Sequence, residues 1–185
     1  MFKKLFTGLI IATLFVTAQT HCSDQNSMLQ AKLDHIAQQK QAIMLELKKT
    51  ITLGKKAIEH MKSLFGDEYE QKASKVTTVI NTIITSQEFH NTLDKSTDYY
   101  ITSIVNEGMN FDNIIYSPQD NSIDQKINDE LAKAFPSLDA QTEQLFNIFY
   151  VTMANVRGIK LLLEKLTECA DNSCTANELA CNNHN

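Results

Sequence analysis

The chain has 185 residues, of which 43% are hydrophobic, and a formal net charge of −5. This length suits one domain with a sizeable core, and the negative charge disfavours nucleic acids and anionic membrane surfaces as partners. Five glycines, two prolines and no tryptophan indicate long helices, since turn-rich sheet proteins use more glycine and proline.

Residues 1–18 have the layout of a secretory signal peptide. Two lysines precede an apolar run over residues 5–16, and the small residue Ala18 offers a cleavage point. The run is shorter than the roughly 20 apolar residues that cross a bilayer. We therefore predict that residues 1–18 are cleaved, that the protein is exported (periplasmic or secreted), and that no stable membrane span remains.

The first predicted elements form a long αα-hairpin. Apolar residues recur at intervals of three and four over residues 27–65, which is the spacing of one helical stripe. Gly66 can end that helix in the left-handed conformation, and a second helix is predicted over 68–107. The apolar stripe shifts near Ser86. The second helix therefore either continues with a stutter or breaks there, with Ser86 as the cap of a new helix.

The segment from Met109 to Asn121 is the longest predicted loop. It is unusually apolar for a connection between helices, and an exposed apolar loop is typical of a protein-docking site. The alternative is that its side chains close one end of the bundle. The candidate interaction residues are Met109, Phe111, Ile114, Ile115 and Tyr116.

Two more helices follow the loop. A short helix over 123–135 ends at Pro136, and Ser137 is the predicted cap of a long helix over 138–168. The last helix has the 4-3 spacing of a coiled coil, and such a seam can form within one chain or between chains. The sequence thus predicts an all-α fold, an elongated antiparallel helical bundle, with a single domain over 19–168. It leaves the oligomeric state open.

The cysteines of the chain are Cys22, Cys169, Cys174 and Cys181. Four cysteines in an exported chain are most simply explained by two disulfides. A short helix predicted over 176–181 would hold Cys174 and Cys181 about 10 Å apart, which is beyond the reach of a disulfide. Cys22 is then joined to the C-terminal tail. Two arrangements remain. The favoured one pairs Cys22 with Cys174 and Cys169 with Cys181, and the other pairs Cys22 with Cys181 and Cys169 with Cys174.

Two other roles fit these cysteines less well. Lipid attachment at Cys22 expects a large aliphatic residue and a small residue where the chain has Gln19 and His21. A zinc site in the tail, residues 169–185, would need a Cys-x4-Cys-x6-Cys-x2-His spacing that is not standard. We therefore predict neither lipid attachment nor a bound metal.

The sequence contains no familiar motif for catalysis or cofactor binding. The five histidines are scattered. His90 and Asp94 share a helical face, and a surface pair explains them better than a metal site does. Arg157 is the single arginine and is expected at the edge of the last helical seam. We predict no catalytic residue, cofactor or metal.

These observations favour an exported, non-enzymatic protein that acts through contacts with another protein. An envelope scaffold, a chaperone-like protein, an adhesin and a secreted effector all fit this description. The alternative is an extracytoplasmic carrier of a small ligand or metal, with a pocket between helices. An enzyme that lacks any recognisable motif is the third interpretation.

Overall fold

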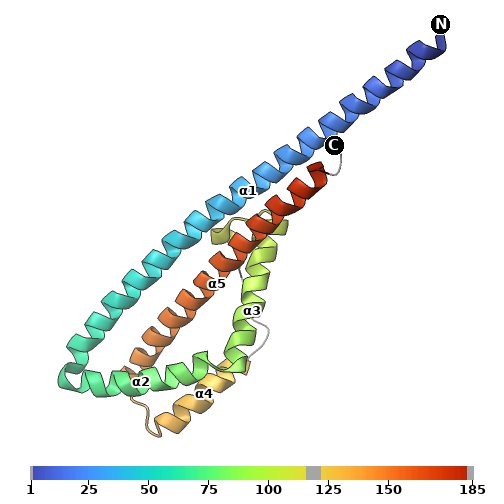
Figure 1. Cartoon of the computed structure of the whole chain (residues 1–185). Helices are drawn as coiled ribbons and strands as arrows, with labels where there is room; N and C mark the ends of the chain where they lie inside the picture. The colour runs from blue at the N-terminus through green and yellow to red at the C-terminus, as the bar shows by residue number, and fades with distance from the viewer. Residues whose placement is uncertain (1, 116–121, 183–185) are drawn as a thin grey trace.

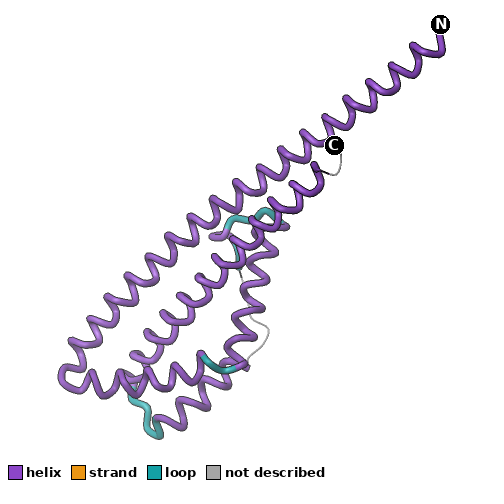
Figure 2. Tube along the Cα trace, viewed as in Figure 1, coloured by secondary structure: helices purple, strands orange, loops and turns teal. Residues whose placement is uncertain are grey.

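A computed structural model describes residues 2–115 and 122–182, with the side chains of residues 27–115 and 122–173. Within these residues every regular element is helical, and Figure 2 shows the helices joined by short loops. The elements are α1 (Phe2–Phe65), the 3-10 turn η1 (Gly66–Glu68), α2 (Tyr69–Ile84), α3 (Gln87–Ile101), the π-helical turn η2 (Thr102–Asn106), the 3-10 turn η3 (Phe111–Asn113), α4 (Ser122–Ala134) and α5 (Ala140–Asn182).

The two longest helices form the frame of the molecule. α1 runs along the whole length of the molecule, and α5 returns beside α1 in the opposite direction (Figure 1). Aliphatic residues are buried where α1 and α5 face each other, among them Ile43 of α1 and Leu166 of α5. The N-terminal part of α1, which contains the predicted signal peptide, projects past the end of α5 (Figure 1). The predicted all-α, elongated antiparallel bundle is confirmed.

α1 and α5 approach each other closely at Gly54. A Cβ atom built on Gly54 would lie 2.5 Å from Cγ2 and 2.9 Å from Oγ1 of Thr152. Such distances are too short for a real Cβ atom, because the overlap would force one helix away from the other. Glycine is therefore the residue that permits this separation of the two helices.

The turn after α1 forms as predicted. Gly66 has a φ of +53°, a left-handed conformation that side chains other than glycine rarely adopt. After η1, α2 crosses the base of the bundle and packs on α4 and α5 (Figure 1). It does not run back along α1 as the second arm of a long hairpin would.

The predicted helix over 68–107 is divided in two. α2 ends at Ile84, and α3 begins directly after Ser86, whose Oγ accepts a hydrogen bond from the backbone N–H of Phe89 at 3.2 Å. Arg157 Nη1 donates to the carbonyl of Ile84 at 3.2 Å, where the carbonyls at the end of α2 need donors. The break confirms the alternative in which Ser86 caps a new helix.

The start of the last helix differs from the prediction. α5 begins at Ala140, because Asp139 and not Ser137 is its cap. Asp139 Oδ1 accepts from the backbone N–H of Thr142 at 2.8 Å, and its Oδ2 accepts from the Thr142 hydroxyl at 2.8 Å. Lys72 of α2 lies 3.4 Å from the same carboxylate. This ion pair links the start of α5 to α2.

The end of the last helix also differs. α5 continues without a break to Asn182, so the predicted short helix over 176–181 is part of α5 and does not form a separate element. The boundary predicted at residue 168 is likewise absent from the backbone. The short helix predicted over 123–135 is α4, which begins and ends one residue earlier than predicted.

The buried residues form two clusters. The lower cluster joins the end of α1 to α2, α4 and the start of α5, and its most buried members include Met61, Val76, Ile80, Ile83, Leu145 and Phe146. The upper cluster joins the middle of α1 to η2, the following loop and the later part of α5. Its buried members are Ile36, Ile43, Ile104, Ile114, Leu162 and Leu166. α3 spans the distance between the two clusters.

Gly54→Ala is expected to lower stability, although alanine is the better helix former. The helix-propensity gain of about 1 kcal/mol is smaller than the overpacking cost of about 1–3 kcal/mol against Thr152. Adding Thr152→Ala should restore most of the loss, because the nearest remaining atom, Thr152 Cβ, is 3.3 Å away. Urea unfolding of the single and double variants measures this coupling.

Gly158→Ala is the matched control for that experiment. A Cβ at Gly158 would meet only Leu93 Cδ1, at 3.3 Å, which is the end of a flexible side chain. Its effect on stability should therefore be small or favourable. Equal losses at the two glycines would contradict the close approach at Gly54.

Because of Asp139, the stability of the fold is expected to fall at low pH. Hydrogen bonds from the backbone and hydroxyl of Thr142, together with Lys72, lower the pKa of Asp139 from 3.8 to about 2. A carboxyl whose pKa is lowered by folding contributes its full stability above its ordinary pKa, and loses it as the pH falls through the folded pKa. The melting temperature should therefore fall between pH 4 and about 2 through this residue.

Two variants distinguish the capping hydrogen bonds of Asp139 from the effect of its charge. Asp139→Ala should lower the melting temperature by a few degrees at neutral pH and weaken the dependence below pH 4. Asp139→Asn should keep the cap and lose that pH dependence, since asparagine caps as well as aspartate but does not titrate. Thermal melts of the three proteins at pH 7, 4 and 2 measure both effects.

Candidate functional site

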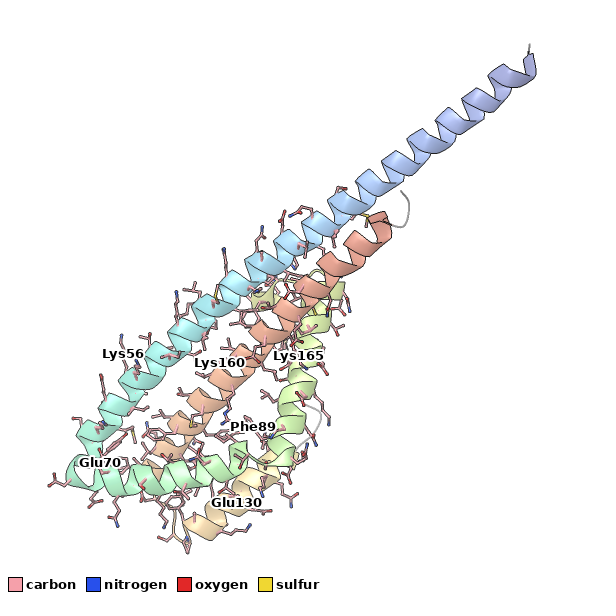
Figure 3. All side chains as sticks on the ribbon, viewed as in Figure 1. Lys56, Glu70, Phe89, Glu130, Lys160 and Lys165 are labelled. Carbon is pink, nitrogen blue, oxygen red and sulfur yellow. The ribbon has the colours of Figure 1, made fainter. Side chains whose placement is uncertain are left out.

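A pocket lies between the lower and upper clusters and is lined by residues of both. Its volume is about 390 Å³, and residues of α1, α3 and α5 supply most of its lining. Phe89 lies at its lower end, near the start of α3 (Figure 3). The pocket therefore occupies the level of the bundle that neither cluster fills.

Small side chains contribute to the pocket lining from all three helices. Thr50 lines it from α1, Ser96 and Thr97 from α3, and Ala154 and Gly158 from α5. Larger apolar residues line it as well, among them Leu93 of α3 and Ile159 and Leu162 of α5.

Aromatic rings line both ends of the pocket. At the upper end the rings of Tyr100 and Phe111 have centroids 5.6 Å apart and are tilted by 38°. At the lower end Tyr150 stacks on Phe146, with centroids 5.7 Å apart and planes within 4°. Burial raises the pKa of both tyrosines above the ordinary value, so both phenols are neutral in the physiological range.

Three residues of α3 that line the pocket carry hydroxyl groups: Thr92, Ser96 and Thr97. Thr92 donates its proton to the carbonyl of Glu88 at 3.0 Å, while Ser96 and Thr97 donate to the carbonyl of Leu93 at 3.0 and 2.8 Å. A hydroxyl whose proton is used in this way still has an acceptor lone pair. These three groups can therefore accept hydrogen bonds from a ligand.

Glu46 is the charged residue in the pocket lining. Its Oε2 lies 3.1 Å from Lys49 Nζ of the same helix, and both side chains are largely exposed. Lys165 of α5, which is labelled in Figure 3, donates to Asp98 of α3 at 2.7 Å and so bridges the two helices. The lining thus contains a carboxylate, and Lys165 is already paired.

The predicted interaction loop is held against the bundle by Gln39 of α1, which is 6% exposed. Its Nε2 donates to Asn110 Oδ1 at 3.0 Å, and its Oε1 accepts from the backbone N–H of Phe111 at 2.7 Å. His35 Nε2 lies 3.2 Å from the carbonyl oxygen of Met109. These contacts fix the start of the loop on α1.

The structure separates the five candidate loop residues into different environments. Ile114 is buried in the upper cluster and Phe111 lines the pocket, which confirms for them the alternative that the loop closes one end of the bundle. Met109 is partly exposed at 37%, and Ile115 is 85% exposed. Tyr116 lies outside the described residues. The docking interpretation therefore rests chiefly on Ile115.

The cysteines are only partly described. Cys169 is a free, half-buried thiol, and the side chains of Cys22, Cys174 and Cys181 lie outside the described residues. Cys169 and Cys181 are twelve residues apart on the continuous helix α5, about 18 Å at 1.5 Å per residue. The favoured pairing of these two residues is therefore wrong for this conformation. A disulfide through Cys22 stays a prediction.

Other candidate sites do not form among the described residues. No group of three or more His, Cys, Asp or Glu side chains is close enough there to hold a metal ion. His90 Nδ1 lies 2.7 Å from the carbonyl of Ser86, so its ring is held at the start of its own helix. Across the same residues, no helix is both long and apolar enough to cross a membrane.

The pocket residues were not identified as a site by the sequence analysis. The sequence signal that could have identified them is the replacement of large apolar residues by small or hydroxyl-bearing residues, at the same level of the apolar stripes of three helices.

Comparison with known proteins finds no matching family model, no matching curated protein and no matching solved structure. The proposal for its function therefore rests on the sequence and the geometry of this chain.

Proposed function

We propose that the protein is an exported carrier that holds a small, largely apolar molecule in the pocket between α1, α3 and α5. The pocket itself is the observation that supports this proposal most directly. Its volume of about 390 Å³ lies within the range of small-molecule sites, which is about 300–1,000 Å³. The signal-peptide pattern of residues 1–18 supports action outside the cytoplasm.

The surroundings of the pocket favour an accessible site. Each cluster joins residues of several helices, one cluster above the pocket and one below it. Most of the lining residues are only partly buried, so the pocket is open to solvent and a ligand can enter it.

The chemistry of the lining favours binding over catalysis. Its hydroxyls donate to backbone carbonyls of their own helix, which leaves them as acceptors and not as activated nucleophiles. The two tyrosines are protonated and offer apolar faces. Aromatic walls with a few acceptors are typical of sites that bind and release a molecule unchanged.

A second function, contact with another protein, is favoured by the exposure of Ile115. This side chain is 85% exposed and follows the segment that Gln39 fixes to α1, so it is presented at a defined place. An exposed apolar side chain can anchor a partner. Other exposed large apolar residues lie mainly on α1, with one each on α3 and α5: Met28, Met44, Leu45, Leu53, Leu64, Tyr99 and Val151.

Filling the pocket should abolish ligand binding without unfolding the protein. The neutral fluorescent probe N-phenyl-1-naphthylamine should bind the wild type, and at 100 times its dissociation constant it should stabilise the fold by about 2.7 kcal/mol. Ala154→Leu and Ser96→Leu each place a larger side chain in the pocket and should weaken binding at least tenfold. Fluorescence titration and thermal melts measure both effects.

Ala132→Leu is the matched control, because Ala132 is exposed on α4 and lies away from the pocket. It should leave probe affinity unchanged. If the two pocket variants keep their fold and bind the probe as well as the wild type does, the carrier proposal is wrong. The same holds if the wild type binds no probe.

The second function has its own test. A photo-crosslinking amino acid in place of Ile115 should yield one adduct of defined mass in the native envelope, identified by mass spectrometry. Gln39→Ala should reduce its yield, since it releases the loop and leaves the Phe111 N–H without its partner. The same group at exposed Lys48 of α1 is the control. Equal and unspecific adducts at both positions would contradict a docking role for Ile115.

A further inference from the structure

The charge of the pocket restricts which molecules it can hold. Among the described lining residues the charged side chain is Glu46, an acid. An anionic ligand would be repelled by this carboxylate.

The neighbouring cations are engaged elsewhere. Lys165 donates a hydrogen bond to Asp98, and this bond is the largest cause of the raised pKa of Lys165. Arg157 donates to the carbonyl of Ile84 at the end of α2. Lys49 pairs with Glu46 itself, and its side chain is 58% exposed. These three cations therefore already have partners.

The walls of the pocket suit a positive charge. Phe89, Tyr100, Phe111 and Tyr150 line it with aromatic rings, whose faces attract cations. The hydroxyl oxygens of Thr92, Ser96 and Thr97 have their protons committed and can accept hydrogen bonds from an ammonium group.

We infer that the ligand is an organic amine with an apolar or aromatic body, bound as the cation with its ammonium group at Glu46 and its body against the aromatic walls. This inference rests on the proposed carrier function and adds the ligand class. The ammonium group would compete with Lys49 for Glu46, so the charge preference is moderate in size. A neutral molecule of the same shape would keep the apolar contacts and lose the ion pair.

Three probes with one ring system test the inference: 1-naphthylmethylammonium, 1-naphthalenemethanol and 1-naphthoate. Calorimetric titration at pH 7 should show the ammonium binding about three- to tenfold more tightly than the alcohol, and the carboxylate most weakly. Glu46→Gln should bring the ammonium to the affinity of the alcohol. Lys49→Gln should tighten ammonium binding, because it removes the competing cation.

Glu59→Gln is the matched control, since it removes the same charge from an exposed position of α1 outside the pocket. It should leave the order of affinities unchanged. Equal binding of ammonium and alcohol, tighter binding of the carboxylate, or an ammonium preference that survives Glu46→Gln would overturn the ligand class while the pocket still binds. Failure of all three probes to bind would overturn the carrier function as well.

Discussion

The contact between α1 and α5 at Gly54 is the constraint on which the arrangement of the other helices depends. Thr152 of α5 occupies the space that a Cβ of α1 would need, so the two longest helices lie unusually close there. This position falls between the buried residues of the lower and upper clusters along α1. The remaining side of the bundle at this level is closed by α3, and Ile123 of α4 and Phe111 of η3 also line the pocket there.

α3 closes that side and contacts both clusters. Phe89 packs in the lower cluster and Tyr100 against the upper one, so both ends of α3 are fixed to the core. Between its ends, Ser96 and Thr97 line the pocket, while Leu93 reaches Gly158 of α5. The pocket therefore lies beside a level at which α3 and α5 are in contact.

The features that could be predicted from the sequence are those set by a few neighbouring residues. Gly66 ends α1 because a left-handed residue is required there, and Ser86 caps α3 through a bond to a backbone group three residues away. Ser137 and Asp139 are both good caps by composition. The choice of Asp139 is reinforced by Lys72, a residue of another helix that no local pattern connects to it.

Features that depend on several helices were not predicted. The direction of α2 after Gly66 follows from its packing on α4 and α5, which the hydrophobic pattern of α2 does not specify. The pocket is a deficit of side-chain volume shared by three helices, and each helix viewed alone shows only an ordinary threonine, serine or alanine. Phe111 and Ile114 likewise could not be assigned to surface or core before Gln39 was seen to hold their loop.

The separation of the buried residues into two clusters has a consequence for how the molecule unfolds. A bound molecule would touch Phe89 and Tyr150 below and Tyr100 and Phe111 above. It would thereby add contacts between the two clusters, so that occupancy of the pocket would couple the unfolding of one cluster more tightly to that of the other.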